Sequence, residues 1–402
     1  MQSPQRLPSS PTADASGASP STAPCSALPL VPPAGSRRLD SLTGLRWWAA
    51  FGVFAHHYRN VGDLPGLDLA GVGYTGVMFF FVLSGFVLTW SARPGVTMPQ
   101  FWIRRVARIW PAHLVALLVA IPVFYAVLGQ SAGAWQKEFS WLPIVLSAVL
   151  LQGFFRDIAI LMGGNPAAWT LSCEALFYFL HPFLNRVLAR LRGLALGAVA
   201  VIVLGLGVLC SWPGIDLPAA VSFLWQFFIG MLIALAMRRG LRITVPWWVP
   251  VAIGVVVILG FWALTHKPLE GQALLVVQVV VRFGPPVVYG LMIAMFASID
   301  LAGRASPMRW RPMVLGGDIS YAFYLIHATV LYAFREAAGR NDSPVLALIL
   351  LCACVGAACL LHYGVERPME RIMRRWGDRR FVPRGAAPAA PAASAAPALP
   401  VR

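Results

Sequence analysis

The sequence predicts an all-α protein that crosses a membrane many times. Of its 402 residues, 58% are hydrophobic and only 12% are charged, and the mean hydropathy is +0.70. This balance is far from that of a soluble globular domain. Apolar runs of about 20 residues, the length that an α-helix needs to cross a bilayer, recur from residue 45 to residue 363. One membrane domain therefore fills the middle of the chain.

Ten apolar segments are long enough to cross the bilayer as helices. They cover residues 44–60, 72–91, 106–128, 169–189, 193–211, 218–237, 246–265, 272–297, 319–335 and 344–363. The two ends of the chain differ from these segments, because residues 1–36 are rich in Pro, Ser and Ala and residues 377–402 repeat that composition. We therefore expect a transmembrane domain at 37–376 between two disordered tails.

An eleventh apolar segment, residues 141–155, is shorter, and the arginines decide how it is interpreted. If it enters from the outer face without crossing, most arginines lie on the cytoplasmic side, including those of "RVLARLR" (186–192) and "MRRGLR" (237–242). A full crossing would place both clusters outside. The sequence therefore favours about ten transmembrane helices with both termini in the cytoplasm. The basic residues are scattered over separate loops, which argues against a nucleic-acid partner.

The first span carries unusual polar residues. His56 and His57 lie at its outer end, in "FAHHYRN", and Arg46 lies about 16 Å away along the same helix. An ionisable residue inside a span is costly and by default indicates a functional site. The cost falls near the membrane surface, so a single histidine there can equally be an incidental polar residue.

Six stretches place these residues in a wider pattern. In chain order they are "RLDSLTGLRWWAAFGVFAHH" (38–57), "GVMFFFVLSGFVLTW" (76–90), "FWIRRVARIWPAHL" (101–114), "AAWTLSCEALFYFLHPFL" (167–184), "ISYAFYLIHATVL" (319–331) and "VERPM" (365–369). Their combination and order resemble the membrane-bound acyltransferase 3 family over about residues 37–375. No single stretch would be sufficient for this resemblance.

The resemblance implies roles for individual residues. The motif arginine of the first span corresponds to Arg46, and the motif histidine falls on His57, with His56 as the alternative because the doubled histidine blurs the register. The family's basic motif and its Trp-Ser/Thr-Leu-Ser-x-Glu motif, with the tyrosine that follows, correspond to Arg104, Arg105, Arg108, Trp169, Thr170, Ser172, Glu174 and Tyr178.

The resemblance also implies an activity. Members of this family transfer an acyl group, often acetyl, from a cytoplasmic coenzyme A thioester to a hydroxyl of a sugar in a surface glycan or glycoconjugate. We therefore expect an O-acyltransferase in the bacterial cytoplasmic (inner) membrane. Its donor substrate would be acyl-CoA, most simply acetyl-CoA, and its acceptor an extracytoplasmic sugar. The sequence contains no metal-ligand cluster, P-loop or dinucleotide motif, and no permanently bound cofactor is expected.

The residue types suit that chemistry. Coenzyme A carries a pyrophosphate and a 3′-phosphate, and Arg104 and Arg108 share one face at the inner start of the third span, so they can grip phosphate oxygens together. A histidine, with an unperturbed pKa of about 6.5, can act as the base for the acceptor hydroxyl at neutral pH. The same histidine could instead become transiently acylated, and the sequence leaves both routes open.

Further polar residues are candidates for the same site. Asn165, Trp169, Thr170 and Ser172 are expected donors to the developing oxyanion near the outer start of their helix. Glu174 could orient a histidine, hold Arg46, or form a structural ion pair. Tyr321 and His327 have roughly helical spacing, and His327 either lines the site or is a satisfied polar residue between helices. Together these residues predict a slot through the membrane.

Two neighbouring motifs are interpreted as structural. Ser84 and Gly85, within an aromatic run, are typical of close helix packing. Glu366 is expected to cap and orient the last span. A transporter or flippase is the main alternative function, although no internal repeat is visible. An interaction scaffold has no need for Arg, His and Glu inside apolar helices.

Overall fold

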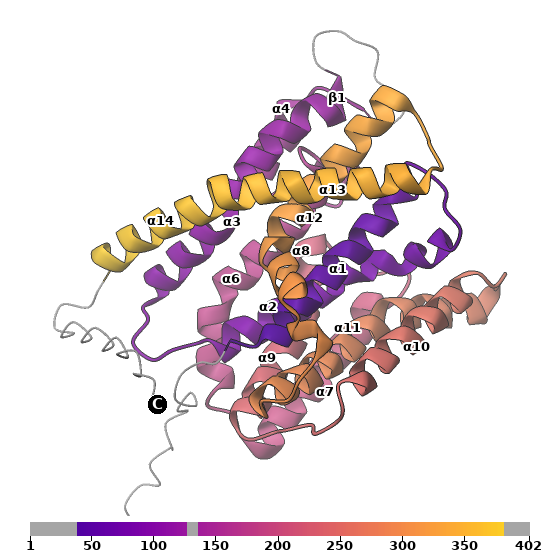
Figure 1. Cartoon of the computed structure of the whole chain (residues 1–402). Helices are drawn as coiled ribbons and strands as arrows, with labels where there is room; N and C mark the ends of the chain where they lie inside the picture. The colour runs from indigo at the N-terminus through magenta and orange to yellow at the C-terminus, as the bar shows by residue number, and fades with distance from the viewer. Residues whose placement is uncertain (1–37, 127–135, 382–402) are drawn as a thin grey trace, which may run out of the picture.

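The computed structural model describes residues 38–126 and 136–381 as a bundle of helices (Figure 1). The first half contains α1 (Asp40–Tyr58), η1 (Leu67–Thr75), α2 (Gly76–Trp90), α3 (Met98–Phe124), α4 (Trp141–Ala148), η2 (Gln152–Phe154), α5 (Ile158–Leu161), η3 (Pro166–Ala168) and α6 (Trp169–Leu188). The second half contains α7 (Gly193–Ser211), α8 (Ala219–Ser222), α9 (Leu224–Arg238), α10 (Trp248–Thr265), α11 (Gly271–Leu301), η4 (Pro307–Arg309), α12 (Arg311–Ala338), α13 (Pro344–Leu361), η5 (His362–Glu366) and α14 (Arg367–Arg380).

The prediction of an all-α polytopic membrane protein is confirmed. In the described ranges, eight helical segments are long and apolar enough to cross a bilayer. Two more, α1 with 19 residues and α6 with 20, have the necessary length but carry charged residues. These two complete the predicted set of ten. Strand pairing within the described ranges is confined to β1 (Tyr125–Ala126) and β2 (Lys137–Glu138), which are parallel.

The segment 141–155 does not cross the membrane, as predicted. Its helix α4 has only eight residues and spans about 12 Å, well short of a bilayer. It ends next to Leu150, whose φ of 61° lies in the left-handed region and reverses the chain direction. The chain continues through the short η2 and then through α5, which has four residues.

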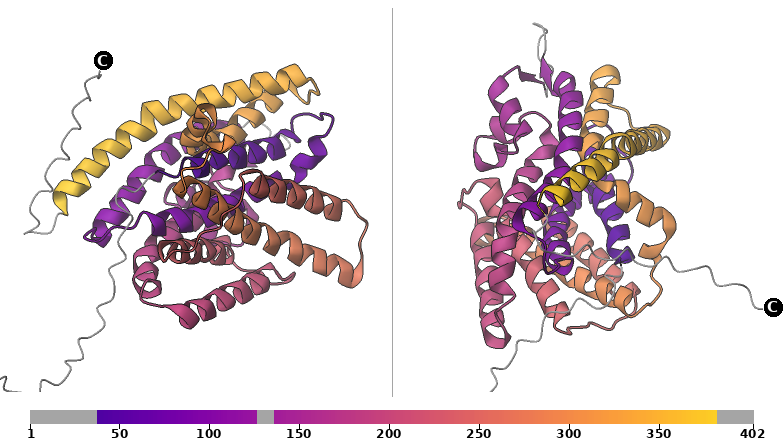
Figure 2. Two further views of the ribbon diagram at one scale, coloured as in Figure 1. Left: turned by 60° about the horizontal axis from the view of Figure 1, so that its bottom comes forward. Right: turned by 90° about the vertical axis from the view of Figure 1, so that its left-hand side faces the viewer.

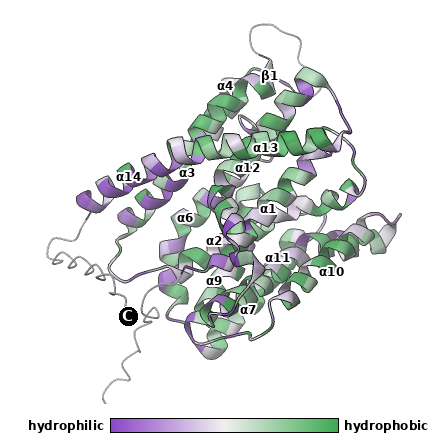
Figure 3. Cartoon of the chain, viewed as in Figure 1, coloured by the Kyte–Doolittle hydropathy of each residue, from purple (hydrophilic) through white to green (hydrophobic). Residues whose placement is uncertain are grey.

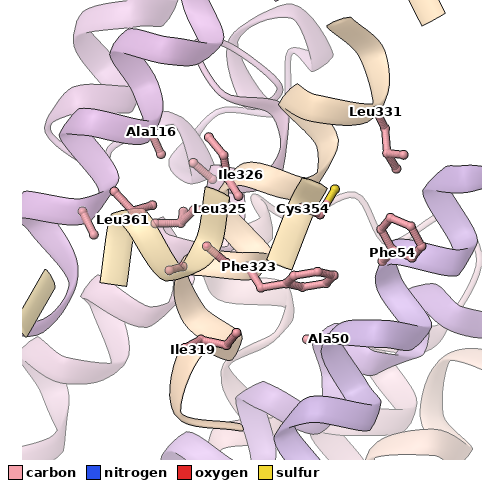
Figure 4. Packing of buried hydrophobic residues seen from close by; sticks show 14 of the residues in the cluster. Ala50, Phe54, Ala116, Ile319, Phe323, Leu325, Ile326, Leu331, Cys354 and Leu361 are labelled. Atoms are coloured by element: carbon pink, nitrogen blue, oxygen red, sulfur yellow. The ribbon is translucent and has the colours of Figure 1, made fainter. Parts of the chain in front are cut away.

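Two pairs of helices form the centre of the bundle, α1 with α12 and α2 with α9. In the first pair, Ala50 and Phe54 of α1 pack against Ile319 and Phe323 of α12, and α13 covers this cluster with Cys354 and Leu361 (Figure 4). In the second pair, a Cβ added to Gly85 of α2 would overlap the backbone of α9. Glycine at this position lets two backbones approach closely, which confirms the packing role predicted for it.

The last three elements form one long helical rod. The π-helical turn η5 joins α13 to α14 without interrupting the helix, and α14 lies along the first half of α3 (Figures 1 and 2). The predicted boundary at residue 376 is therefore too early, because α14 continues to Arg380. The rest of the expected C-terminal tail, and the expected N-terminal tail at 1–36, lie outside the described residues.

The bundle has two distinct ends. The α14 end contains α14 together with the first turns of α1, α3 and α12, and it is hydrophilic along α14 and the start of α3 (Figure 3). The η1 end contains η1 and the last turn of α1. Between the two ends the outward surface is strongly apolar, with α7 and α10 exposing most of their side chains. Such a band is what a lipid bilayer covers.

Candidate active site

A cavity of about 220 Å³ lies inside the bundle, between α1, α2, α3, α6 and α12. Its apolar walls are interrupted by a set of polar side chains from all five helices. These are Arg46, Ser84, Arg105, Arg108, Thr170, Glu174, Tyr178, Ser320, Tyr321 and Tyr324. Seven of the residues singled out from the sequence for catalysis or binding, from four separate motifs, therefore meet in one cavity. They are Arg46, Arg105, Arg108, Thr170, Glu174, Tyr178 and Tyr321.

Glu174 is held by neutral hydroxyl groups. Ser84 donates a hydrogen bond to its Oε1 at 3.2 Å, and the Tyr178 hydroxyl, one turn further along α6, donates to its Oε2 at 3.2 Å. The predicted contacts of this carboxylate with a histidine or directly with Arg46 are not formed. Ser84 thus has a second role beside the packing of its neighbour Gly85, because its hydroxyl faces the cavity.

Arg46 lines the cavity without a direct partner. It forms no hydrogen bond or ion pair with any residue that the structure describes, although Glu174 is near enough to act on it electrostatically. An arginine inside a membrane bundle normally pairs with a carboxylate or with backbone carbonyls. A guanidinium that faces a cavity with its donors unused is available to bind a ligand.

The basic motif on α3 divides its arginines between two roles. Arg104 does not line the cavity and instead pairs with Asp378 of α14, its Nη2 lying 2.7 Å from Oδ1. Arg105 lines the cavity, stacks over the ring of Phe101, and keeps a buried Nε without a partner among the described residues. The two guanidinium groups bind different carboxylates in this structure, and their joint grip on phosphate stays a prediction.

Arg108 forms the third arginine of the cavity wall and is anchored from behind. Its Nη1 contacts Glu366 and lies 3.3 Å from Oε2 of Glu370, and Glu366 also pairs with His362 at 2.9 Å. Glu366 is fully buried at the π-helical turn. It therefore neutralises Arg108 inside a continuous helix, which corrects the helix-capping role expected for it.

The histidines lie beyond the other end of the cavity. The ring centroids of His57 and His327 are 5.2 Å apart, and those of His56 and His57 are 5.4 Å apart. His56 donates from Nδ1 to the carbonyl oxygen of Gly71 at 3.0 Å, which ties it to η1. His57 has no hydrogen-bond partner in the part of the chain that the structure describes. His57 is therefore the freer of the two rings.

A thin wall separates the histidines from the cavity. Val53, Val77, Ala167 and Tyr324 pack together there. The Tyr324 hydroxyl accepts a hydrogen bond from Thr170 at 3.1 Å, while the Tyr324 backbone carbonyl accepts one from Nδ1 of His327 at 2.8 Å. His327 is fully buried, and its Nε2 has no partner in the described ranges. Tyr324 thus contacts both the central cavity and the histidines beyond it.

Three predicted oxyanion donors have structural roles instead. Ser172 is buried away from the cavity, where it donates to Gln152 at 2.9 Å and accepts from the backbone of Gly153. Asn165 donates to the Leu325 carbonyl oxygen at 2.8 Å and caps η3. Trp169 packs against Phe81 and Phe223. Their motif spacing located the right segment of chain, but only the structure distinguishes its cavity face from its packed face.

Sequence reasoning missed the acidic partners on α14. Glu370 lies within the predicted transmembrane domain and Asp378 within the expected tail, and neither was singled out, yet they bind Arg108 and Arg104. A signal was present in the regular spacing of "RPMERIMRRWGDRR", where acidic residues recur eight positions apart among arginines. That spacing puts both carboxylates on one face of a helix.

Comparisons with known proteins agree on the family. Residues 39–363 match the family model described as an acyltransferase domain. The chain is 32% identical to Acyltransferase MdmB of Streptomyces mycarofaciens over 398 residues, covering 88% of this chain and 96% of that protein. It is 28% identical to the exopolysaccharide production protein ExoZ of Rhizobium meliloti, covering 79% of this chain and 94% of that protein.

A further similarity is shorter. Peptidoglycan O-acetyltransferase OatA of Listeria monocytogenes is 29% identical over 206 residues, which cover 44% of this chain and 30% of that protein. No solved structure matches the chain. The family model spans most of the sequence, and the first relative is matched over nearly its full length. The chain therefore belongs to the acyltransferase 3 family and is a multi-pass integral membrane acyltransferase.

Proposed function

We propose that this protein moves an acyl group, acetyl in the simplest case, from acyl-CoA in the cytoplasm to a hydroxyl of an extracytoplasmic glycan or glycoconjugate. The proposal places it in the bacterial cytoplasmic membrane with both termini inside. Two observations support the acceptor class, since similar proteins are named for peptidoglycan O-acetylation and for exopolysaccharide production. The arginines concentrated at the α14 end support a cytoplasmic position for that end.

The observation that carries the proposal is the pair of unneutralised arginines in the cavity. Arg46 and Arg105 face the same cavity, and neither forms an ion pair within the described ranges. Two half-buried positive charges without ion-pair partners are costly inside a membrane bundle, so a ligand with anionic or strongly polarised oxygens would be favoured there. A thioester carbonyl and the phosphates behind it have these properties. Arg105 lies at the α14 end, where such a donor would enter.

The proposed reaction joins a donor that approaches through the central cavity to an acceptor that approaches on the side of the histidines. The acceptor oxygen forms a new bond to the carbonyl carbon, the carbon–sulfur bond breaks, and the sulfur leaves with the proton that the hydroxyl gives up. A histidine can carry that proton from the hydroxyl to the sulfur. His57 is suited to this step because its ring is free of other hydrogen bonds in the described structure, and His327 lies beside it. Arg46 lies about 16 Å from His57 along α1, so in this scheme it binds the donor within the cavity and does not contact the reacting carbonyl.

Tyr324 has a definite role in this scheme. The thioester approaches from the cavity and the hydroxyl approaches from the η1 end, so the Tyr324 ring lies between the reactants. Transfer requires this side chain to swing away from Thr170. Until that swing occurs, the Tyr324 ring would keep water from reaching the thioester through the η1 end, and so limit wasteful hydrolysis.

The test is acyl transfer from radiolabelled acetyl-CoA in membranes at matched expression, with label counted in the extracytoplasmic glycan fraction. We expect His57→Ala to lower transfer by about 10²- to 10⁴-fold, the usual contribution of a general acid–base group. His266→Ala, a histidine on the α10–α11 loop, is the matched control and should keep full activity. Equal activity of His57→Ala and wild type would contradict the proposed base.

The same assay separates the enzyme from a transporter. Labelled acetyl groups must appear covalently on the glycan, and an unmodified acceptor that crosses the membrane would contradict acyl transfer. Arg46→Gln tests the cavity independently of the histidines. It should raise the donor KM more than it lowers kcat, because it removes a charged group that would bind the donor within the cavity.

A further inference from the structure

The central cavity is too small for the whole donor. Its volume of about 220 Å³ falls below the roughly 300–1,000 Å³ that sites for drug-sized ligands occupy. A slender acyl-pantetheine arm can enter such a space, but a nucleotide with three phosphates cannot share it. If the proposed function holds, the nucleotide must bind elsewhere, close to the cavity and at the α14 end.

A second hollow lies at that place. It has a volume of about 360 Å³ and lies along α14, lined by Arg367, Glu370, Arg371, Arg374, Arg375 and Asp378. Both carboxylates are already engaged, Glu370 by Arg108 and Arg374 and Asp378 by Arg104. The arginines of this α14 hollow therefore outnumber its acidic groups and leave it positive.

Three of these arginines carry unneutralised charge in a row. Arg367, Arg371 and Arg375 are four residues apart and share one face of α14. None forms an ion pair within the described residues, although Arg367 stacks over the ring of Tyr363. Like charges at this spacing repel each other, so the row is unfavourable by itself. A multivalent anion would remove that repulsion, and guanidinium groups bind phosphate through two parallel hydrogen bonds.

The α14 hollow adjoins the central cavity through Glu370. One oxygen of Glu370 accepts from Arg108, which lines the cavity, and the other accepts from Arg374, which lines the hollow, at 3.3 and 3.1 Å. Arg374 is also near enough to Arg105 for their charges to interact. A ligand with its phosphates on α14 could therefore extend its arm past Arg105 into the cavity.

We propose that the α14 hollow binds the phosphate groups of the donor's nucleotide, with Arg367, Arg371 and Arg375 as the binding residues. This inference rests on the proposed function, because it names the donor's second contact. It assigns the nucleotide to α14, whereas the sequence predicted that arginines of the α3 motif bind its phosphates. Arg104 and Arg108, paired with carboxylates of α14, instead hold that helix in place beside the cavity.

The experiment measures direct binding, so that it does not depend on transfer. Adenosine 3′,5′-bisphosphate, the phosphate-bearing fragment of coenzyme A, is titrated into the full-length protein in nanodiscs of zwitterionic lipid, with adenosine as the ligand control. The variant Arg371→Gln/Arg375→Gln should raise Kd by about tenfold or more, because each lost charge-assisted hydrogen bond has a large effect. Arg379→Gln/Arg380→Gln removes two charges from the same helix outside the hollow and should leave Kd nearly unchanged.

Each result decides the proposal. Failure of the wild type to bind the bisphosphate, or equal Kd in the two double variants, would overturn it. So would a loss that appears only when anionic lipid is added to the nanodiscs, because the hollow would then bind a lipid phosphate. Arg371→Lys/Arg375→Lys serves as a second variant and should give an intermediate Kd, since lysine keeps the charge without the bidentate geometry. Normal bisphosphate binding without acyl transfer would contradict the proposed function alone.

Discussion

The central cavity and the interface between α3 and α14 contain the same kinds of charged group, but arrange them in opposite ways. At the interface, Arg104 and Arg108 each bind a carboxylate of the last helices. In the cavity, Arg46 and Arg105 have no carboxylate within ion-pair distance in the described chain. Arg104 and Arg105 are neighbours in sequence, and a rotation of about 100° around α3 separates the arginine paired at the interface from the arginine that faces the cavity. Under the proposed function, pairing distinguishes the donor-binding arginine from its neighbour, which motif position alone does not.

The strongest test of the interface is Glu366→Ala. This change leaves Arg108 and His362 without their shared partner in a buried position, and breaking such a network costs about 3–5 kcal/mol of stability. Thermal unfolding in detergent measures the loss. Glu336→Ala, which removes an exposed carboxylate from α12, should change stability by less than about 0.5 kcal/mol. Equal effects of the two changes would mean that Glu366 is not part of a stabilising network.

The next test sets the two neighbouring arginines against each other. Arg105→Gln should raise the donor KM by about tenfold or more, since it removes a charged donor that faces the cavity. Arg104→Gln should leave KM close to the wild-type value, because Arg104 binds Asp378 instead. Steady-state kinetics with varied acetyl-CoA measure both. A larger effect of Arg104→Gln on KM would contradict the assignment of Arg105 to donor binding in the cavity and of Arg104 to the interface.

A third test concerns the packing of α2, one of the helices around the cavity, against α9. Gly85→Ala would force apart α2 and α9, because the new Cβ overlaps the backbone at Phe227, and such overpacking costs about 1–3 kcal/mol. Gly205→Ala on α7 meets open space and should instead stabilise by about 0.5–1 kcal/mol. Unfolding midpoints of the two variants should therefore shift in opposite directions. Shifts in the same direction would show that the close approach of α2 and α9 is not needed for stability.

The smallest effect is expected at the rim of the interface. A double-mutant cycle on Arg104→Ala and Asp378→Ala should give a coupling of about 0.2–1 kcal/mol, because the Asp378 side chain is 44% exposed. The coupling should fall as salt is added. A coupling as large as that expected at Glu366 would place the Arg104–Asp378 pair in a drier environment than its exposure indicates.

The sequence predicted the helices closely because the bilayer imposes a length and an apolar composition on each span. The predicted limits of 193–211 coincide with α7, and 344–363 ends within two residues of α13. The end of α14 was missed, since helix formation there depends on packing against α3 as well as on apolar length. Spans follow from composition, whereas docked helices follow from contacts between segments far apart in the chain.

The site was predicted in part, and the errors share one physical origin. Motif spacing located the segments that carry Arg46, Glu174 and Tyr178, and these side chains do face the cavity. Spacing did not predict which face of each helix points inward at Ser172, nor that Asp378 would neutralise Arg104. Both depend on partners more than a helix length away, one on η2 and one on α14, and a local pattern contains no information about them.

The charges of the cavity also have a consequence for how the protein enters the membrane. The free energy of inserting each span into the membrane depends largely on how apolar that span is. An arginine or aspartate at the centre of a helix raises this free energy by about 2.5–3.5 kcal/mol. Arg46 and Glu174 make α1 and α6 the weakest insertion signals among the long helices. These two helices must therefore be retained by neighbours such as α2 and α12. Assembly of the bundle and burial of the two charges consequently become a single step of biogenesis.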